Sequence, residues 1–342
     1  MNILLTGGTG YIGSHAAVAF VEAGHKVVLF DNLSNSQRHV VDRIAKIVGR
    51  DVPFVEGDVR DTPLLAHTLK AHQVDAVVHF AGLKAVGESV AKPLAYYANN
   101  LQGTISLLQA METSGVGTLV FSSSATVYGD PSYLPIDEQH PTSATNPYGR
   151  TKLQIEEMLA DLSASSSSWK IARLRYFNPV GAHPSGMIGE DPNGIPNNLM
   201  PFVTRVAAGL LPQLSVFGND YPTPDGTGVR DYIHVLDLVD GHVSALNFLT
   251  TQSPGGCHTF NLGTGQGYSV LEMVRAFEHA SGQKVPYQIV ARRPGDIASC
   301  YAKVDHAAKT LGWKARLGLT DMCQSNWHFQ QQLKKSDQTG LA

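Results

Sequence analysis

The sequence predicts an α/β protein in which a doubly wound parallel sheet carries a smaller α/β lobe. Two observations lead to this prediction. Short apolar strands alternate with helical patterns from the N-terminus to about residue 178, and residues 181–201 are rich in glycine, proline and asparagine. The 342 residues are enough to bury two cores. We therefore expect a first domain over residues 1–178 and a second over residues 179–342.

The first predicted strand is followed at once by a glycine turn and a helix. Residues 2–6 form the short buried strand, and a helical pattern follows the turn. In a turn of this kind the first glycine permits a tight bend, the second admits a pyrophosphate, and the third lets the helix pack on the strand. Gly7, Gly10 and Gly13 fit these three roles. The order of elements favours dinucleotide binding, with an ordinary glycine-rich turn as the alternative.

The second predicted strand, residues 26–30, ends at Asp31. A carboxylate in this position accepts hydrogen bonds from both hydroxyls of an adenosine ribose, and it repels a phosphate attached there. Asp31 therefore favours NAD over NADP, although the nearby Arg38 leaves NADP open.

Two further strands end in loops that carry charge. Residues 52–55 lead to Asp58, and residues 74–80 lead to Lys84. Because ligands bind outside the carboxyl ends of parallel strands, we expect both loops to face the cofactor. Asp58 is a candidate for the adenine edge and Lys84 for another cofactor contact. An ordinary exposed loop charge is an equal alternative for each.

The next predicted strand, residues 118–122, runs into a series of hydroxyl side chains. These hydroxyls lie at the same edge of the sheet as the glycine turn. Ser124 is therefore a candidate hydrogen-bond donor to the substrate. For Ser122 and Ser123 a role in capping the next turn is the alternative.

A helix is predicted to begin at Pro147 and to run through Leu159, because proline suits a first helical turn and disfavours helix in the residue before it. Tyr148 and Lys152 then share a face. A tyrosine base at neutral pH needs its pKa lowered by roughly 2–3 units, about 3–4 kcal/mol. An ammonium about 4 Å away provides roughly 4 kcal/mol at an effective dielectric constant of about 20. The pair predicts an acid/base tyrosine; taken alone, it is also typical of a solvated helix surface.

Cationic residues recur in the second lobe, after a predicted helix at residues 199–208. Arg230 begins a predicted strand, and Arg292 and Arg293 stand shortly before Asp296. Arginine binds phosphate through forked hydrogen bonds. We expect a phosphorylated substrate here, with solvated arginines as the alternative.

Composition and charge exclude several classes of protein. The formal net charge is −3 and no basic stripe is present, so a nucleic-acid partner is not expected. Cys257, Cys300 and Cys323 are far apart and the histidines are scattered, so we expect no metal site. No apolar run is long enough to span a membrane, and no basic segment precedes the first strand. We expect a soluble cytoplasmic protein.

The motifs together resemble those of the extended short-chain dehydrogenase/reductase superfamily: Gly7-x-x-Gly10-x-x-Gly13, Ser124 and Tyr148-x-x-x-Lys152. Four longer runs, residues 80–89, 175–184, 194–201 and 230–235, are similar to the UDP-glucose 4-epimerase family, and the likeness spans essentially the whole chain. The resemblance implies a Rossmann NAD domain, a homodimer, and reversible NAD-dependent epimerisation at carbon four of a UDP-hexose. It also implies that part of residues 230–262 returns to the first domain.

The resemblance further implies roles for single residues. Tyr148 would be the acid/base group, Lys152 would lower its pKa and bind the nicotinamide ribose, and Ser124 would position the sugar 4-hydroxyl. The implied cofactor contacts are Gly7, Gly10, Tyr11, Ile12, Gly13, Asp31, Asn32, Asn35, Ser36, Asp58, Val59, Phe80, Ala81, Gly82, Lys84, Asn99, Ser122, Tyr148, Lys152 and Tyr176. The implied UDP-sugar contacts are Ser124, Tyr148, Asn178, Asn198, Leu199, Phe217, Arg230, Tyr232, Arg293, Asp296 and Cys300.

Two positions depart from the family pattern. Met187-Ile188 stands where an acidic residue followed by methionine is common in relatives, so the contacts of that loop are not predicted. Cys300 stands where some relatives carry tyrosine, which would leave room for a 2-acetamido group and extend the substrates to UDP-GlcNAc and UDP-GalNAc. A small buried cysteine without a role is the alternative.

Two rival functions can be weighed on the sequence. Nucleotide-sugar 4,6-dehydratases carry an Asp-Glu pair after a threonine in the serine region, whereas here Ser124 is followed by Ala125-Thr126. A non-catalytic NAD-binding regulator would not need Ser124, Tyr148 and Lys152. The fold alone would not decide between these functions.

Overall fold

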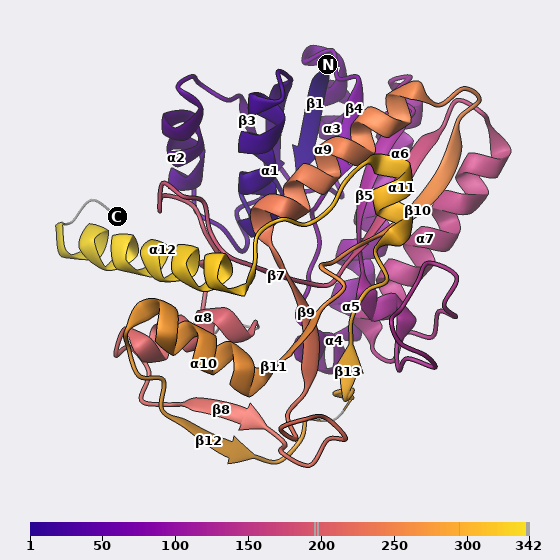
Figure 1. Cartoon of the computed structure of the whole chain (residues 1–342). Coiled ribbons are helices and arrows are strands. Elements are labelled where there is room, and N and C mark those ends of the chain that lie inside the picture. Colours follow the sequence, from indigo (N-terminus) through magenta and orange to yellow (C-terminus); the bar gives the residue numbers. More distant parts are fainter. Residues whose placement is uncertain (195, 197, 294, 340–342) are drawn as a thin grey trace.

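The computed structural model describes the chain except residues 195, 197, 294 and 340–342, so Ile195 and Asn197 of the 194–201 run lie outside the described residues. A seven-stranded parallel sheet with the order β10-β6-β5-β4-β1-β2-β3 forms its centre (Figure 1). Such a sheet is buried on both faces, which explains the nearly continuous apolar runs of its strands. The strands are β1 (Asn2–Thr6), β2 (Lys26–Asp31), β3 (Phe54–Glu56), β4 (Ala76–His79), β5 (Thr118–Ser124), β6 (Lys170–Tyr176) and β10 (Gly256–Leu262).

Helices cover both faces of this sheet, and a separate apolar core lies under each layer. This arrangement confirms the doubly wound α/β fold that the sequence predicts. One layer contains α1 (Tyr11–Glu22), α2 (His39–Val48), α9 (Val235–Thr251) and α11 (Asp305–Leu311). The other contains α3 (Thr62–Ala71), α6 (Gln102–Thr113) and α7 (Pro147–Ser165), with the short segments α4 (Val86–Ala91), α5 (Pro93–Tyr96) and η1 (Tyr97–Leu101) before α6.

The second lobe lies beyond the carboxyl ends of the sheet strands, at the bottom of Figure 1. In it β9 pairs with β7, β11 and β13, β8 pairs with β12, and the helices enclose a third apolar core. Its elements are β7 (Asn178–Val180), α8 (Leu199–Ala207), β8 (Leu214–Phe217), β9 (Val229–His234), β11 (Gly267–Ser269), α10 (Val270–Ser281), β12 (Tyr287–Val290), β13 (Ser299–Cys300) and α12 (Leu319–Thr339).

The chain enters the second lobe and then returns to the first sheet. Helix α9 packs against α1, and β10 pairs in parallel with β6, with Phe260 opposite Leu174. Three elements that follow Arg230, namely α9, β10 and α11, therefore belong to the seven-stranded sheet and its helix layers. The boundary near residue 178 stays a prediction, and it is not a single cut in the sequence.

Most strand ends differ from the prediction by one or two residues. The difference that matters for function is in β5, which continues past Ser122 and ends at Ser124. The 3₁₀ helix η2 (Ala125–Tyr128) follows at once. Ser124 is therefore the last residue of a central strand, at the edge where a parallel sheet binds ligands.

Candidate active site

The glycine turn forms a closed bend with one open side. Gly7 has a φ of 69°, and a Cβ there would lie 2.7 Å from the amide nitrogen of Ala81. A Cβ on Gly13 would lie 2.1 Å from the carbonyl oxygen of Gly7, so helix and strand pack too closely for any side chain. Gly10 caps α1, and a Cβ there would meet only the Gly7 oxygen, at 3.3 Å. The helix N-terminus is thus open at Gly10, which fits the pyrophosphate of a dinucleotide.

Asp31 lies beside this turn at the end of β2. Its Oδ2 accepts a hydrogen bond from the Thr9 amide at 3.1 Å, and its Oδ1 accepts one from the Leu33 amide at 2.9 Å. Ser36 joins the group through Thr9, with 2.6 Å between the two hydroxyl oxygens. Arg38 is directed to Glu56, at 3.7 Å, and stacks on Phe54. Arg38, the residue that kept NADP possible as the cofactor, is therefore paired with the carboxylate of Glu56.

Helix α7 begins where the sequence predicts. The Asn146 side chain accepts a hydrogen bond from the Gly149 amide at 2.9 Å, and Pro147 occupies the first turn. Tyr148 and Lys152 are both buried, on the face toward the sheet. The Lys152 ammonium donates to the carbonyl oxygen of Ser122 at 2.6 Å. The cap therefore fixes the helix start that brings both residues to the carboxyl end of β5.

The structure does not bear out the expectation that Lys152 lowers the pKa of Tyr148. Burial raises this pKa above its ordinary value, and a hydrogen bond with Ser124 lowers it again in part. Burial lowers the pKa of Lys152 to about 8, opposed by Glu156. A shared helical face does not fix where a long side chain ends, and here a β5 carbonyl takes the ammonium. Ser124, not Lys152, is the group that lowers the pKa of Tyr148 in this structure.

The remaining predicted cofactor residues surround this edge of the first sheet. Asp58 accepts a hydrogen bond from Asn32 at 3.2 Å, and hydrogen bonds from Arg60 lower its pKa to about 2. Tyr176 is buried and, with Phe80, packs on the ring of His242. The others lie in α1 (Tyr11, Ile12), in the turn after β2 (Asn35), against Gly103 (Val59), in the loop after β4 (Ala81, Gly82) and in η1 (Asn99).

Apart from Ser124 and Tyr148, the predicted substrate residues gather in the second lobe. Strand pairing sets Asn178 opposite Tyr232 and Cys300 opposite Arg230. Arg293 pairs with Asp296 at 2.9 Å and lies over the ring of Phe217, 4.6 Å from its centroid. Asn198 occupies the N-cap position of α8, directly before Leu199, without a capping hydrogen bond from its side chain. Arg292 instead pairs with Asp220, so the two neighbouring arginines have different partners.

Comparison with known proteins gives a consistent result. A family model described as GDP-mannose 4,6 dehydratase matches residues 4–326. The UDP-glucose 4-epimerase of Bacillus subtilis (strain 168) is 58% identical over 330 residues, covering 96% of this chain and 97% of the relative. The chain belongs to the UDP-glucose 4-epimerase family.

Solved structures of epimerases agree with this family. A crystal structure from Stenotrophomonas maltophila, with bound NAD and formylated UDP-arabinopyranose, has a TM-score of 0.96 at 55% identity and covers 98% of this chain and 99% of that chain. One from Bifidobacterium longum, in complex with NAD⁺ and UDP, has a TM-score of 0.94 at 51% identity and covers 97% and 98%. The resemblance drawn from the motifs is thereby confirmed.

Two buried carboxylates of this epimerase-family chain were not singled out in the sequence. Glu190 accepts hydrogen bonds from Lys84 at 2.9 Å and from Asn198 at 2.6 Å, so it bridges a predicted cofactor residue and a predicted substrate residue. Its only signal was the departure at Met187-Ile188 nearby. Glu156 follows Lys152 by one helical turn and is 1% exposed. Its signal was the four-residue spacing from Tyr148 through Lys152.

Neither a metal site nor a membrane span appears in the part of the chain that the structure describes. Histidine, cysteine, aspartate and glutamate form no cluster that could hold an ion among these residues. No described helix combines the length and apolar character needed to cross a bilayer.

Proposed function

We infer that this protein is an isomerase that catalyses the reversible NAD-dependent 4-epimerisation of UDP-glucose and UDP-galactose. The observation that carries this conclusion is the meeting of Ser124, Tyr148 and Lys152 at the sheet edge next to the open glycine turn. Relatives crystallised with NAD and UDP compounds support the same ligands here.

The residues divide the chemistry among them. Tyr148 removes the proton of the sugar 4-hydroxyl and later gives it back, while Ser124 holds that oxygen in place. NAD⁺, when bound, supplies a cationic ring that accepts the hydride of carbon four and returns it. Arg230 and Arg293 hold the UDP group, so that the 4-keto sugar can rotate to present its other face without leaving the site. Return of the hydride to the opposite face inverts carbon four.

The 4,6-dehydratase reading receives less support, although the matching family model bears a dehydratase description. Elimination of water needs a carboxylate next to the serine, and η2 presents Ala125, Thr126, Val127 and Tyr128 there. An NAD-binding regulator would have no use for a buried tyrosine hydrogen-bonded to Ser124.

Purified protein is expected to carry NAD without any addition, because a cofactor regenerated in each turnover gains nothing from leaving. Acid denaturation followed by chromatography should release close to one NAD per chain. Protein that is isolated without nucleotide and turns over only with added NADP would show that the roles of Gly10 and Asp31 are wrong.

The substrates are proposed to include UDP-GlcNAc and UDP-GalNAc, because Cys300 pairs with Arg230 and adjoins η2. Filling such a space with a ring costs about 1–3 kcal/mol, or roughly 5- to 150-fold in rate ratio. Cys300→Tyr should suppress epimerisation of the N-acetyl sugars by that factor and leave UDP-galactose turnover, the internal control, within a few-fold. Equal loss of both activities would remove Cys300 as the determinant.

A homodimer is also proposed. Val86 and Val90 of α4 and Leu94 of α5 are large apolar residues that are 42%, 64% and 82% exposed. Exposed apolar groups at neighbouring positions favour a protein contact. Sedimentation equilibrium should give twice the chain mass, with dissociation in Leu94→Glu; a monomeric parent protein would refute the assignment.

A cytoplasmic location is also proposed, because all three cysteines are free thiols, as is usual in a reducing compartment. Cell fractionation tests this location.

A further inference from the structure

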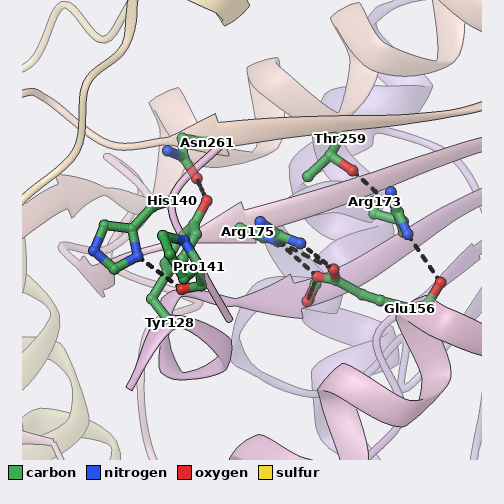
Figure 2. Close-up of polar contacts among 9 residues, drawn as sticks. Tyr128, His140, Pro141, Glu156, Arg173, Arg175, Thr259 and Asn261 are labelled. Carbon is green, nitrogen blue, oxygen red and sulfur yellow. Dashed lines mark hydrogen bonds and ion pairs between the residues drawn. The ribbon is translucent and has the colours of Figure 1, made fainter. Parts of the chain in front are cut away.

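Glu156 is a buried carboxylate with four hydrogen bonds from two strands. The Ser123 hydroxyl donates to its Oε1 at 2.5 Å. The guanidinium of Arg175 donates to both of its oxygens, with Nη2 at 2.5 Å from Oε2. Glu156 and Arg175 are 1% and 6% exposed, and Figure 2 shows the pair between α7 and the sheet.

The partners of Glu156 belong to the strand that carries the catalytic serine. Ser123 of β5 pairs with Arg175 of β6, and the next pair along is Ser124 with Tyr176. Ser122, on the other side of Ser123, provides the carbonyl that accepts from Lys152. One short stretch of β5 therefore holds Glu156, Lys152 and the serine that contacts Tyr148.

On the helix, Tyr148, Lys152 and Glu156 follow one another at intervals of four residues and are all buried. This spacing places them on one face of α7. A shift or rotation of the helix at Glu156 would therefore move the other two side chains relative to Ser124. The bidentate contact with Arg175 fixes both the position and the orientation of the carboxylate.

We propose that Glu156, held by Arg175 and Ser123, is a positioning residue for the epimerisation reaction, which keeps Tyr148 and Lys152 in register with Ser124. The inference rests on the proposed function for its kinetic consequence. Glu156 does not itself reach the reacting atoms, because its oxygens are engaged by Ser123 and Arg175.

The charges around Lys152 give the proposal a second consequence. Glu156 opposes the lowering of the Lys152 pKa that burial causes, and Arg175 lies behind Glu156 as a balancing cation. The other titratable groups around this cluster are His79 on β4, which is neutral because burial lowers its pKa to about 3, Cys257 on β10, Tyr128, whose ring lies 4.9 Å from the Arg175 guanidinium, and the tyrosines Tyr96, Tyr148 and Tyr176. Loss of the Glu156 charge alone would leave Arg175 uncompensated and lower the Lys152 pKa further.

Position and charge can be separated by two substitutions. Glu156→Asp keeps the charge but is one methylene shorter, so kcat for UDP-galactose should fall about tenfold or more with KM changed less than about threefold. Glu156→Gln keeps the shape but removes the charge. Because the ammonium form of Lys152 is then lost at lower pH, the alkaline limb of the kcat profile should move down by about one pH unit.

Substitution of Arg175, the other member of the ion pair, tests the direction in which the alkaline limb moves. Arg175→Gln breaks the same contact but leaves the negative charge, so its alkaline limb should stay in place or move up. Arg173→Met is the matched control: Arg173 also lies on β6, but it donates to the main-chain oxygen of Glu156 and to Thr259 (Figure 2). Because it leaves the Glu156 carboxylate with Ser123 and Arg175, it should leave the alkaline limb near the parent value and lower kcat less than Glu156→Asp does.

A spectroscopic readout makes the outcome independent of turnover. The ultraviolet absorbance of the Tyr148 phenolate, obtained by subtracting a Tyr148→Phe background, should appear at higher pH in Glu156→Asp, because a change of register weakens the hydrogen bond with Ser124 that lowers the Tyr148 pKa, while melting curves report folding. Parent-like kcat in Glu156→Asp, or a downward limb shift in both Glu156→Gln and Arg175→Gln, would overturn the proposal. Absence of epimerase activity in the parent protein would refute the proposed function instead, and the phenolate titration would still test the positioning.

Discussion

Replacement of Tyr148 by phenylalanine is expected to lower the turnover number for UDP-galactose by ~10²–10⁴, the range for removal of a general acid–base group. The substitution keeps the buried ring and removes only the hydroxyl that Ser124 contacts. Binding of UDP should change little, because the residues assigned to UDP lie in the second lobe. Initial rates and UDP titrations by calorimetry measure the two quantities.

A second buried tyrosine provides the matched control for this variant. Tyr96 is fully buried, and its hydroxyl bonds to the main chain of Ala85 and to Glu88. Tyr96→Phe should cost stability, about 1–3 kcal/mol, because buried partners lose a hydrogen bond. Its turnover should stay within a few-fold. Near-normal turnover in Tyr148→Phe would eliminate the proposed base.

Lys152→Met should have the second largest effect. Methionine fills much of the same buried volume but has no charge and cannot donate to the Ser122 carbonyl. We expect turnover to fall by about 10²–10⁴, because the substitution releases α7 from the Ser122 carbonyl of β5 and removes the ammonium that is proposed to bind the nicotinamide ribose.

The pH profile provides an independent check on Lys152. The ammonium form is complete well below the folded pKa of about 8 and is lost as the pH rises through it. Turnover of the parent protein should therefore decline on the alkaline side near that pH, and the residual rate of Lys152→Met should lack this limb. An unchanged limb in the variant would assign it to another group.

The glycine turn, Asp31 and the start of α7 could be predicted because each depends on local rules. Gly7 needs a positive φ, Asp31 ends an apolar strand, and Asn146-Pro147 caps a helix. Each of these features is determined by a few adjacent residues.

The buried role of Glu156 could not be predicted in this way. A glutamate four residues after a lysine is typical of a solvated helix face. Its burial depends on the register that sets Ser123 opposite Arg175, and strand register is not contained in either strand alone.

The prediction that Lys152 lowers the pKa of Tyr148 was wrong for a related reason. Helical spacing shows which residues share a face, but the β5 carbonyl that takes the Lys152 ammonium belongs to a separate element. Likewise, the return of α9 and β10 to the first sheet was expected only from the family resemblance, since no local pattern marks it.

The most direct test of the central claim is incubation of the purified protein with UDP-galactose and no added cofactor, followed by separation of the nucleotide sugars. We expect UDP-glucose to form until a mixture is reached that is also reached from UDP-glucose, without net formation of NADH. A 4-keto-6-deoxy product, or recovery of UDP-galactose unchanged from protein that contains NAD, would contradict it.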